Sequence, residues 1–91
     1  MSVTVRIPTQ LRELSGGEGE VTLEPGPLGA VLAALDAAHP GFAGRLFDES
    51  GELRRFVNVF VADEDIRFLD GIETEVTEGQ VVSIVPAVAG G

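Results

Sequence analysis

Alternating apolar and polar residues predict strands near both ends of the chain and in its second half. Residues 3–7 and 20–24 alternate with period two, which predicts an N-terminal hairpin across the turn at residues 15–19. Residues 55–62 are rich in Val and Phe and predict a third strand. Residues 81–85 predict the last strand.

One helix is predicted between the hairpin and the third strand. Pro27 suits the first helical position, and residues 39–41, His-Pro-Gly, end the helix. Apolar side chains recur at helical spacing and form the predicted core face: Leu28, Val31, Leu32, Leu35 and Ala38.

The remaining segments are predicted from weaker patterns. Residues 42–47 fit a helical turn packed on the core through Phe42, Leu46 and Phe47, followed by a turn at residues 48–51. The acidic residues 63–65 predict a solvated turn that ends the third strand, and residues 66–68 predict a short extended piece. This order of elements predicts an α+β fold in which a helix covers one face of a sheet.

Length and composition favour a single globular domain with an acidic surface. The chain has 91 residues, 44% of them hydrophobic and 23% charged, with a net charge of −9. An acidic surface repels phosphate backbones, so no nucleic-acid partner is expected. No apolar stretch has the length of a signal peptide's apolar region or of a membrane span, so we expect no membrane association and a cytoplasmic protein.

The chain contains neither cysteine nor lysine. The absence of cysteine excludes disulfides, thiolate metal ligands and a thiol nucleophile. The acidic residues 63–65 lack the spacing and the glycine of a calcium loop, and His39 has no second histidine to join it, so no metal site is predicted. Without lysine, the N-terminal amine is the one amine of this chain that could attack its own C-terminal carboxylate if that carboxylate were activated.

The chain ends in Gly90-Gly91, directly after the last predicted strand. Glycine has no Cβ, so such an end can pass through a narrow channel and present its carboxylate to another enzyme. We expect a domain over residues 1–85 and a flexible diglycine tail over residues 86–91. Pro86 cannot donate to a sheet ladder and is expected to end the strand and direct the tail.

Sequence motifs add a resemblance that spans essentially the whole chain. Residues 55–68 read RFVNVFVADEDIRF and residues 86–91 read PAVAGG. With the order of elements, these resemble the ubiquitin-like β-grasp sulfur carriers of the MoaD and ThiS family, most closely those of cysteine biosynthesis. The resemblance implies a β-grasp fold with a mixed sheet of four to five strands and one main helix on one face. Gly79-Gln80 and Pro86-Ala87 depart from the Gly-Asp and Pro-Pro that MoaD-like proteins often have, which weakens a molybdopterin role.

The resemblance also implies a mechanism centred on Gly91. An E1-like enzyme would adenylate the Gly91 carboxylate with ATP, and sulfur would convert it to a thiocarboxylate. A PLP-dependent cysteine synthase would then take up the sulfur, and a zinc-dependent peptidase would release cysteine. The chain is thus expected to be a protein cosubstrate and not an enzyme, with no bound cofactor of its own, since ATP, PLP and zinc belong to its partners.

Two further site predictions concern partner contacts. The tail residues expected to enter partner active sites are Pro86, Ala87, Val88, Ala89 and Gly90. If Val57, Val59 and Val61 face the helix, Phe60 lies on the open face of the sheet and can contact a partner. Two other functions stay open: a MoaD-like small subunit of molybdopterin synthase, and a ubiquitin-like protein modifier or interaction module.

Overall fold

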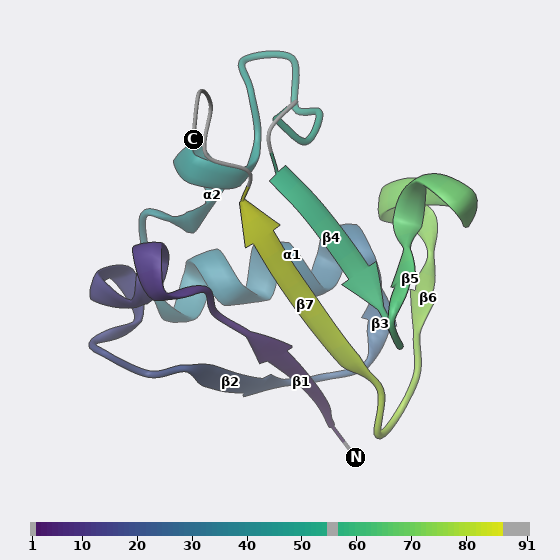
Figure 1. Cartoon of the computed structure of the whole chain (residues 1–91), viewed down its shortest axis with the longest axis horizontal. Helices are drawn as coiled ribbons and strands as arrows, with labels where there is room; N and C mark the ends of the chain where they lie inside the picture. The colour runs from purple at the N-terminus through teal and green to yellow at the C-terminus, as the bar shows by residue number, and fades with distance from the viewer. Residues whose placement is uncertain (1, 55–56, 87–91) are drawn as a thin grey trace.

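A five-stranded sheet with one main helix against its inner face forms the body of the molecule (Figure 1). The computed structural model describes residues 2–54 and 57–86. The sheet strands are β1 (Val3–Arg6), β2 (Glu20–Leu23), β4 (Val57–Val61), β5 (Glu64–Asp65) and β7 (Val81–Pro86). Their order is β2-β1-β7-β4-β5, with β1 and β7 parallel and the other neighbours antiparallel. The predicted mixed sheet is therefore confirmed.

Short helices and a second strand pair complete the fold. The α-helices are α1 (Leu28–Ala38) and α2 (Phe42–Leu46), and the 3-10 helices are η1 (Thr9–Ser15), η2 (Ile66–Phe68) and η3 (Gly71–Glu73). A small ladder pairs β3 (Gly26–Pro27) with β6 (Glu75–Val76). The predicted N-terminal hairpin is confirmed as the antiparallel pair of β1 and β2, and η1 lies in the connection between them.

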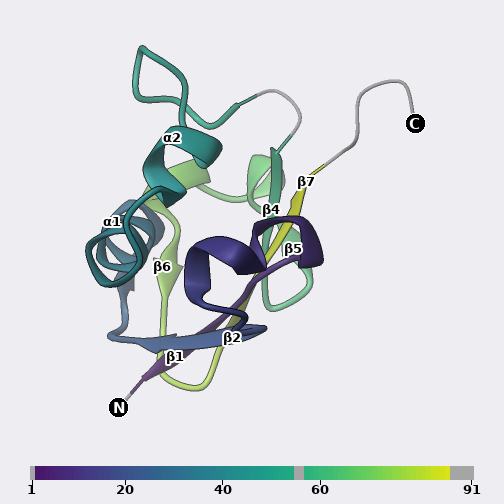
Figure 2. The ribbon, with the colours of Figure 1, turned by 90° about the vertical axis from the view of Figure 1, so that its left-hand side faces the viewer.

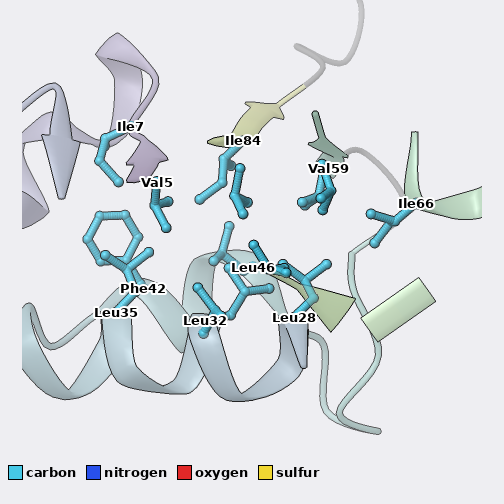
Figure 3. Close-up of a cluster of buried hydrophobic side chains, with 14 of the residues drawn as sticks. Val5, Ile7, Leu28, Leu32, Leu35, Phe42, Leu46, Val59, Ile66 and Ile84 are labelled. Atoms are coloured by element: carbon cyan, nitrogen blue, oxygen red, sulfur yellow. The ribbon is translucent and has the colours of Figure 1, made fainter. Parts of the chain in front are cut away.

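The core lies between α1 and the inner face of the sheet (Figure 3). Alternation along β4 places Val57, Val59 and Val61 in the core, as the period of two requires. From the helix side the core receives Leu28, Val31, Leu32 and Leu35. Phe42 and Leu46 of α2 are fully buried, so the predicted helical turn is confirmed for these two side chains, while Phe47 is only partly buried.

Two details of the predicted helix are wrong. Ala38 is exposed, because it lies in the last turn of α1 and Phe42 fills the core beside Leu35 (Figure 3). Pro27 precedes the helix with an extended ψ of 143°, since it pairs with Glu75 in the β3–β6 ladder. The N–H of Leu28 then donates to the carbonyl of Thr74 at 2.8 Å, which ties the start of α1 to β6.

The acidic segment and its successor also differ from the prediction. Ala62 and Asp63 both adopt positive φ, at 51° and 69°, which is the conformation of a two-residue hairpin turn. The predicted exposed turn that ends the third strand is therefore confirmed at Asp63, whereas Glu64 and Asp65 return as a strand beside β4. Residues 66–68 form a 3-10 turn and not an extended piece, because the Asp65 carboxylate accepts the N–H of Arg67 at 2.9 Å and caps that turn.

Candidate functional site

The candidate site is the end of β7, where the C-terminal tail begins. β7 lies in the middle of the sheet, between β1 and β4, and Pro86 at its end pairs with Val57 of β4. Pro86 is thus the last residue of the strand and not the first residue after it. Residues 87–91, including the predicted sulfur attachment site Gly91 and the tail residues Ala87, Val88, Ala89 and Gly90, lie outside the described residues.

The open face of the sheet lies beside this strand end. Because the three valines of β4 point inward, Asn58 and Phe60 point to the opposite face, as predicted. Phe60 is partly exposed and pairs with Ser83 of β7. Val85, paired with Asn58, is 46% exposed. Phe60 and Val85 thus give the open face an apolar area close to the base of the tail.

A notch borders the end of β7 on the side of β1. Its volume is about 420 Å³, and the residues that line it come from the end of β1, from η1 and from β7. Figure 2 shows η1 close to the path of β1 toward this end of the sheet. The lining consists of Arg6, Ile7, Pro8, Thr9, Gln10, Arg12, Ser83, Ile84, Val85 and Pro86.

A second, apolar groove lies between β4, the loop that precedes it, η2 and η3. It has a volume of about 570 Å³ and is lined in part by Leu53, Val57 and Ile72. Phe68 is 86% exposed on the nearby η2. The sequence pattern indicates neither this groove nor the exposure of Phe68. Ile66, Phe68 and Leu69 are apolar residues close together in a short segment. Their spacing does not show which of these side chains is buried and which is exposed.

The titratable groups of the described residues offer little chemistry. The pKa of Asp48 is lowered, first by a hydrogen bond from the Ser50 hydroxyl and then by the backbone N–H of Glu52. This carboxylate holds the loop that precedes β4 and lies in an exposed turn. Within residues 2–54 and 57–86, no three acidic or histidine side chains come together as metal ligands. In the same part of the chain, no helix has the length and apolarity needed to cross a membrane.

Two of the proteins that resemble this chain, one in sequence and one in structure, have the same name. "Sulfur carrier protein CysO" of Mycobacterium tuberculosis is 50% identical over 93 residues, with 100% of both chains covered. The crystal structure of the Amycolatopsis orientalis BexX/CysO complex contains a chain that matches with a TM-score of 0.91 and 45% identity, covering 98% of this chain and 99% of that one.

A relative of a different name matches a shorter part. "Small archaeal modifier protein 3" of Haloferax volcanii is 44% identical over 64 residues, covering 70% of this chain and 68% of that protein. The ThiS family matches residues 5–91, which include all of the sheet but the first two residues of β1, the residues that line the notch, and the C-terminal diglycine. The chain therefore belongs to the ThiS family.

Proposed function

We propose that this chain is a sulfur carrier whose C-terminal carboxylate, on Gly91, is converted to a thiocarboxylate that supplies sulfur for cysteine biosynthesis. The observation that supports this most is the position of Pro86 at the end of a central strand, with a family match that continues to Gly91. The 50% identity to a protein named sulfur carrier protein CysO supports the same function.

The proposed chemistry begins with activation, because a carboxylate is a poor acyl donor. An E1-like enzyme would join the Gly91 carboxylate to the AMP part of ATP and release pyrophosphate. Sulfide would then displace AMP and leave the thiocarboxylate directly. A persulfide of a partner would displace AMP to give an acyl disulfide, and a second thiol of the partner would then release the thiocarboxylate by forming a disulfide with the remaining partner sulfur. This group ionises readily and is nucleophilic at neutral pH, for the same reason that a thiolate is. Since the chain contains no cysteine, its C-terminus is the place where it can hold transferable sulfur covalently.

The folded part of the chain contributes position and reach. β7 lies between β1 and β4, and its pairing with β4 continues to Pro86, where proline restricts φ just before the tail. The five residues 87–91 span at most about 17 Å when extended. That length lets Gly91 enter a partner's active site while the sheet remains outside it. Small uncharged side chains in the tail keep the cost of this entry low.

We propose the open face as the contact surface for the partners. Phe60 lies there beside the strand that leads into the tail, and Val85 extends the same apolar area. Aromatic side chains at such places often supply much of the binding energy.

The proposed partners are the E1-like enzyme, a PLP-dependent cysteine synthase and a zinc-dependent peptidase that releases cysteine. ATP, PLP and zinc act in those enzymes. Because ATP is an intracellular reactant, the cytoplasm is the proposed compartment.

An intact-mass experiment tests the proposal. The purified chain is incubated with host lysate, ATP and sulfide, and then treated with iodoacetamide at neutral pH. Without any cysteine in the chain, alkylation on Gly91 reports a thiocarboxylate. We expect an ATP-dependent label that tandem mass spectrometry maps to Gly91 and that a chain lacking Gly90-Gly91 does not acquire. The absence of such a label from lysate that activates a known carrier of this family would contradict the proposal.

A second candidate is a protein modifier, favoured by the 44% identity to small archaeal modifier protein 3 over 64 residues. In that case Gly91 would be joined to lysine amines of other proteins. The present chain has no lysine, so it would form no chains of itself through that residue. Mapping lysine-linked Gly91 in host proteins would select this function. A MoaD-like subunit would instead co-purify stably with a larger enzyme.

A further inference from the structure

The notch beside the end of β7 exists because the ladder between β1 and β7 stops early. The pairing runs Thr4 with Val81, Val5 with Val82 and Arg6 with Ser83, and goes no further. On its other side, β7 stays paired with β4 as far as Pro86. Residues 84–86 therefore have strand pairing on one side only among the described strands. In Figure 1, β1 turns away toward η1 while β7 continues to its arrowhead.

Proline explains where the ladder stops. Parallel pairing begins with the N–H of Thr4 donating to the carbonyl of Gln80, and it repeats every two residues. If this repeat continued, the carbonyl of Ile84 would accept the next bond from the N–H of residue 8. That residue is Pro8, which has no N–H. Pro86, the last residue of β7, also lacks an N–H. The edge at residues 84–86 therefore presents acceptors and suits a segment that brings hydrogen-bond donors.

The notch has the opposite charge to the molecule as a whole. Arg6 and Arg12 line it, and no acidic residue is among the described residues of its lining, whereas the chain has a net charge of −9. Arg6 makes an exposed ion pair with Glu20 at 3.5 Å. Arg12 donates from Nε to the carbonyl of Ile7 at 3.0 Å, which holds its guanidinium at the notch. An anionic group fits this site and a cationic one does not.

We infer that the notch receives an extended acidic segment of the enzyme that activates Gly91, which pairs with the free edge of β7 next to the tail. This inference rests on the proposed function and names the kind of partner surface that it requires. Strand addition at an open edge combines backbone hydrogen bonds with specificity from side chains. Here the two arginines select an acidic segment. Because the notch adjoins Pro86, docking there fixes the direction in which the tail leaves the sheet.

Gln10 allows a test that leaves the arginines in place. It is exposed, it lines the notch, and no side-chain hydrogen bond from it occurs among the described residues. Gln10→Glu adds a negative charge to the notch, and Gln10→Arg adds a positive one. Ala30→Glu and Ala30→Arg are matched controls, because Ala30 is exposed on the first turn of α1 and does not line the notch.

The measurement is the initial rate of Gly91 labelling against the concentration of the chain, in host lysate with ATP and sulfide. We expect Gln10→Glu to raise the half-saturating concentration about threefold or more, because it opposes an acidic partner segment. Gln10→Arg should lower it, because it adds positive charge where the acidic segment binds, and both Ala30 variants should match the wild-type chain. Raising the salt concentration should reduce the difference between Gln10→Glu and Gln10→Arg.

Each other outcome overturns the inference in a recognisable way. Equal half-saturating concentrations for Gln10→Glu and wild type would show that no acidic segment enters the notch. An equal effect of Ala30→Glu would assign the change to net charge alone. Thermal unfolding of every variant separates these results from loss of the fold. If the wild-type chain acquires no label, the proposed function fails first and the inference fails with it.

Discussion

Pro86 and Val57 lie opposite each other as the last pair of the β7–β4 ladder. Val57 is buried in the core, so Pro86, the last strand residue before the tail, lies directly beside a well-packed residue. Pro86 adds a restricted φ at the same place. The central sheet therefore sets the path of the chain as far as Pro86, the last described residue.

Replacing Pro86 by glycine tests this relationship. Pro86→Gly releases φ at the base of the tail, and we expect the rate of Gly91 labelling at subsaturating concentration to fall several-fold, since the tail must then be ordered on binding. The unfolding midpoint in urea should change little, because Pro86 is at the strand end. A labelling rate equal to that of wild type would show that the proline has no role in directing the tail.

Burial predicts that Phe42 and Phe68 contribute very differently to the free energy of unfolding. Phe42 is 0% exposed and Phe68 is 86% exposed. Phe42→Ala should lower the free energy of unfolding by about 3–5 kcal/mol, because it removes apolar contacts and leaves a cavity. The same substitution at Phe68 should change it by less than about 0.5 kcal/mol. Urea unfolding of both variants measures this, and similar losses in both would contradict the described packing.

Alanine variants of Phe60 and Phe68 test whether activation depends on a partner contact at the open face or on any exposed aromatic side chain. Phe60→Ala should weaken activation of Gly91, seen as a higher half-saturating concentration of the chain in the labelling assay, because the proposed contact face loses its aromatic side chain. Phe68→Ala removes a more exposed aromatic residue from η2 and should leave that concentration unchanged. The reverse ranking would move the partner contact from the open face to η2.

The Asp48 carboxyl should titrate below its ordinary value. The Ser50 hydroxyl and the N–H of Glu52 donate to its charged form and lower its pKa from 3.8. A lowered folded-state pKa stabilises the fold above the unfolded value, and that contribution is lost as the pH falls through the folded value. NMR titration of the side-chain carboxyl should give a midpoint below 3.8. Ser50→Ala should move it upward, and no movement would contradict the stated cause.

The sequence predicted burial correctly in the elements long enough for the strand or helix period to repeat. The alternation in β4 correctly placed its three valines inward and Phe60 outward, and the spacing of Leu28, Leu32 and Leu35 correctly predicted the buried face of α1. These predictions hold because burial on one side of an element imposes its period on the sequence.

Predictions were wrong where a few local hydrogen bonds or a tertiary pairing decided the structure. Residues 66–68, predicted to be extended, form a 3-10 turn because the Asp65 carboxylate accepts the N–H of Arg67, whereas the turn predicted at Asp63 is present. β3 and β6 are two residues long, too short for a period to appear. The notch depends on where the ladder between β1 and β7 ends, at Arg6 and Ser83, and these strands are far apart in sequence, so only the register of the sheet reveals it.

The most direct test of the central claim is to isolate the chain from its host cells and determine by intact-mass and tandem mass spectrometry what is joined to Gly91. The proposed function predicts an alkylatable sulfur on Gly91, or a cysteine attached through it, with both increasing when cells are starved of cysteine. If Gly91 is found only as a free carboxylate or only joined to lysines of other proteins under that starvation, the sulfur-carrier account is contradicted.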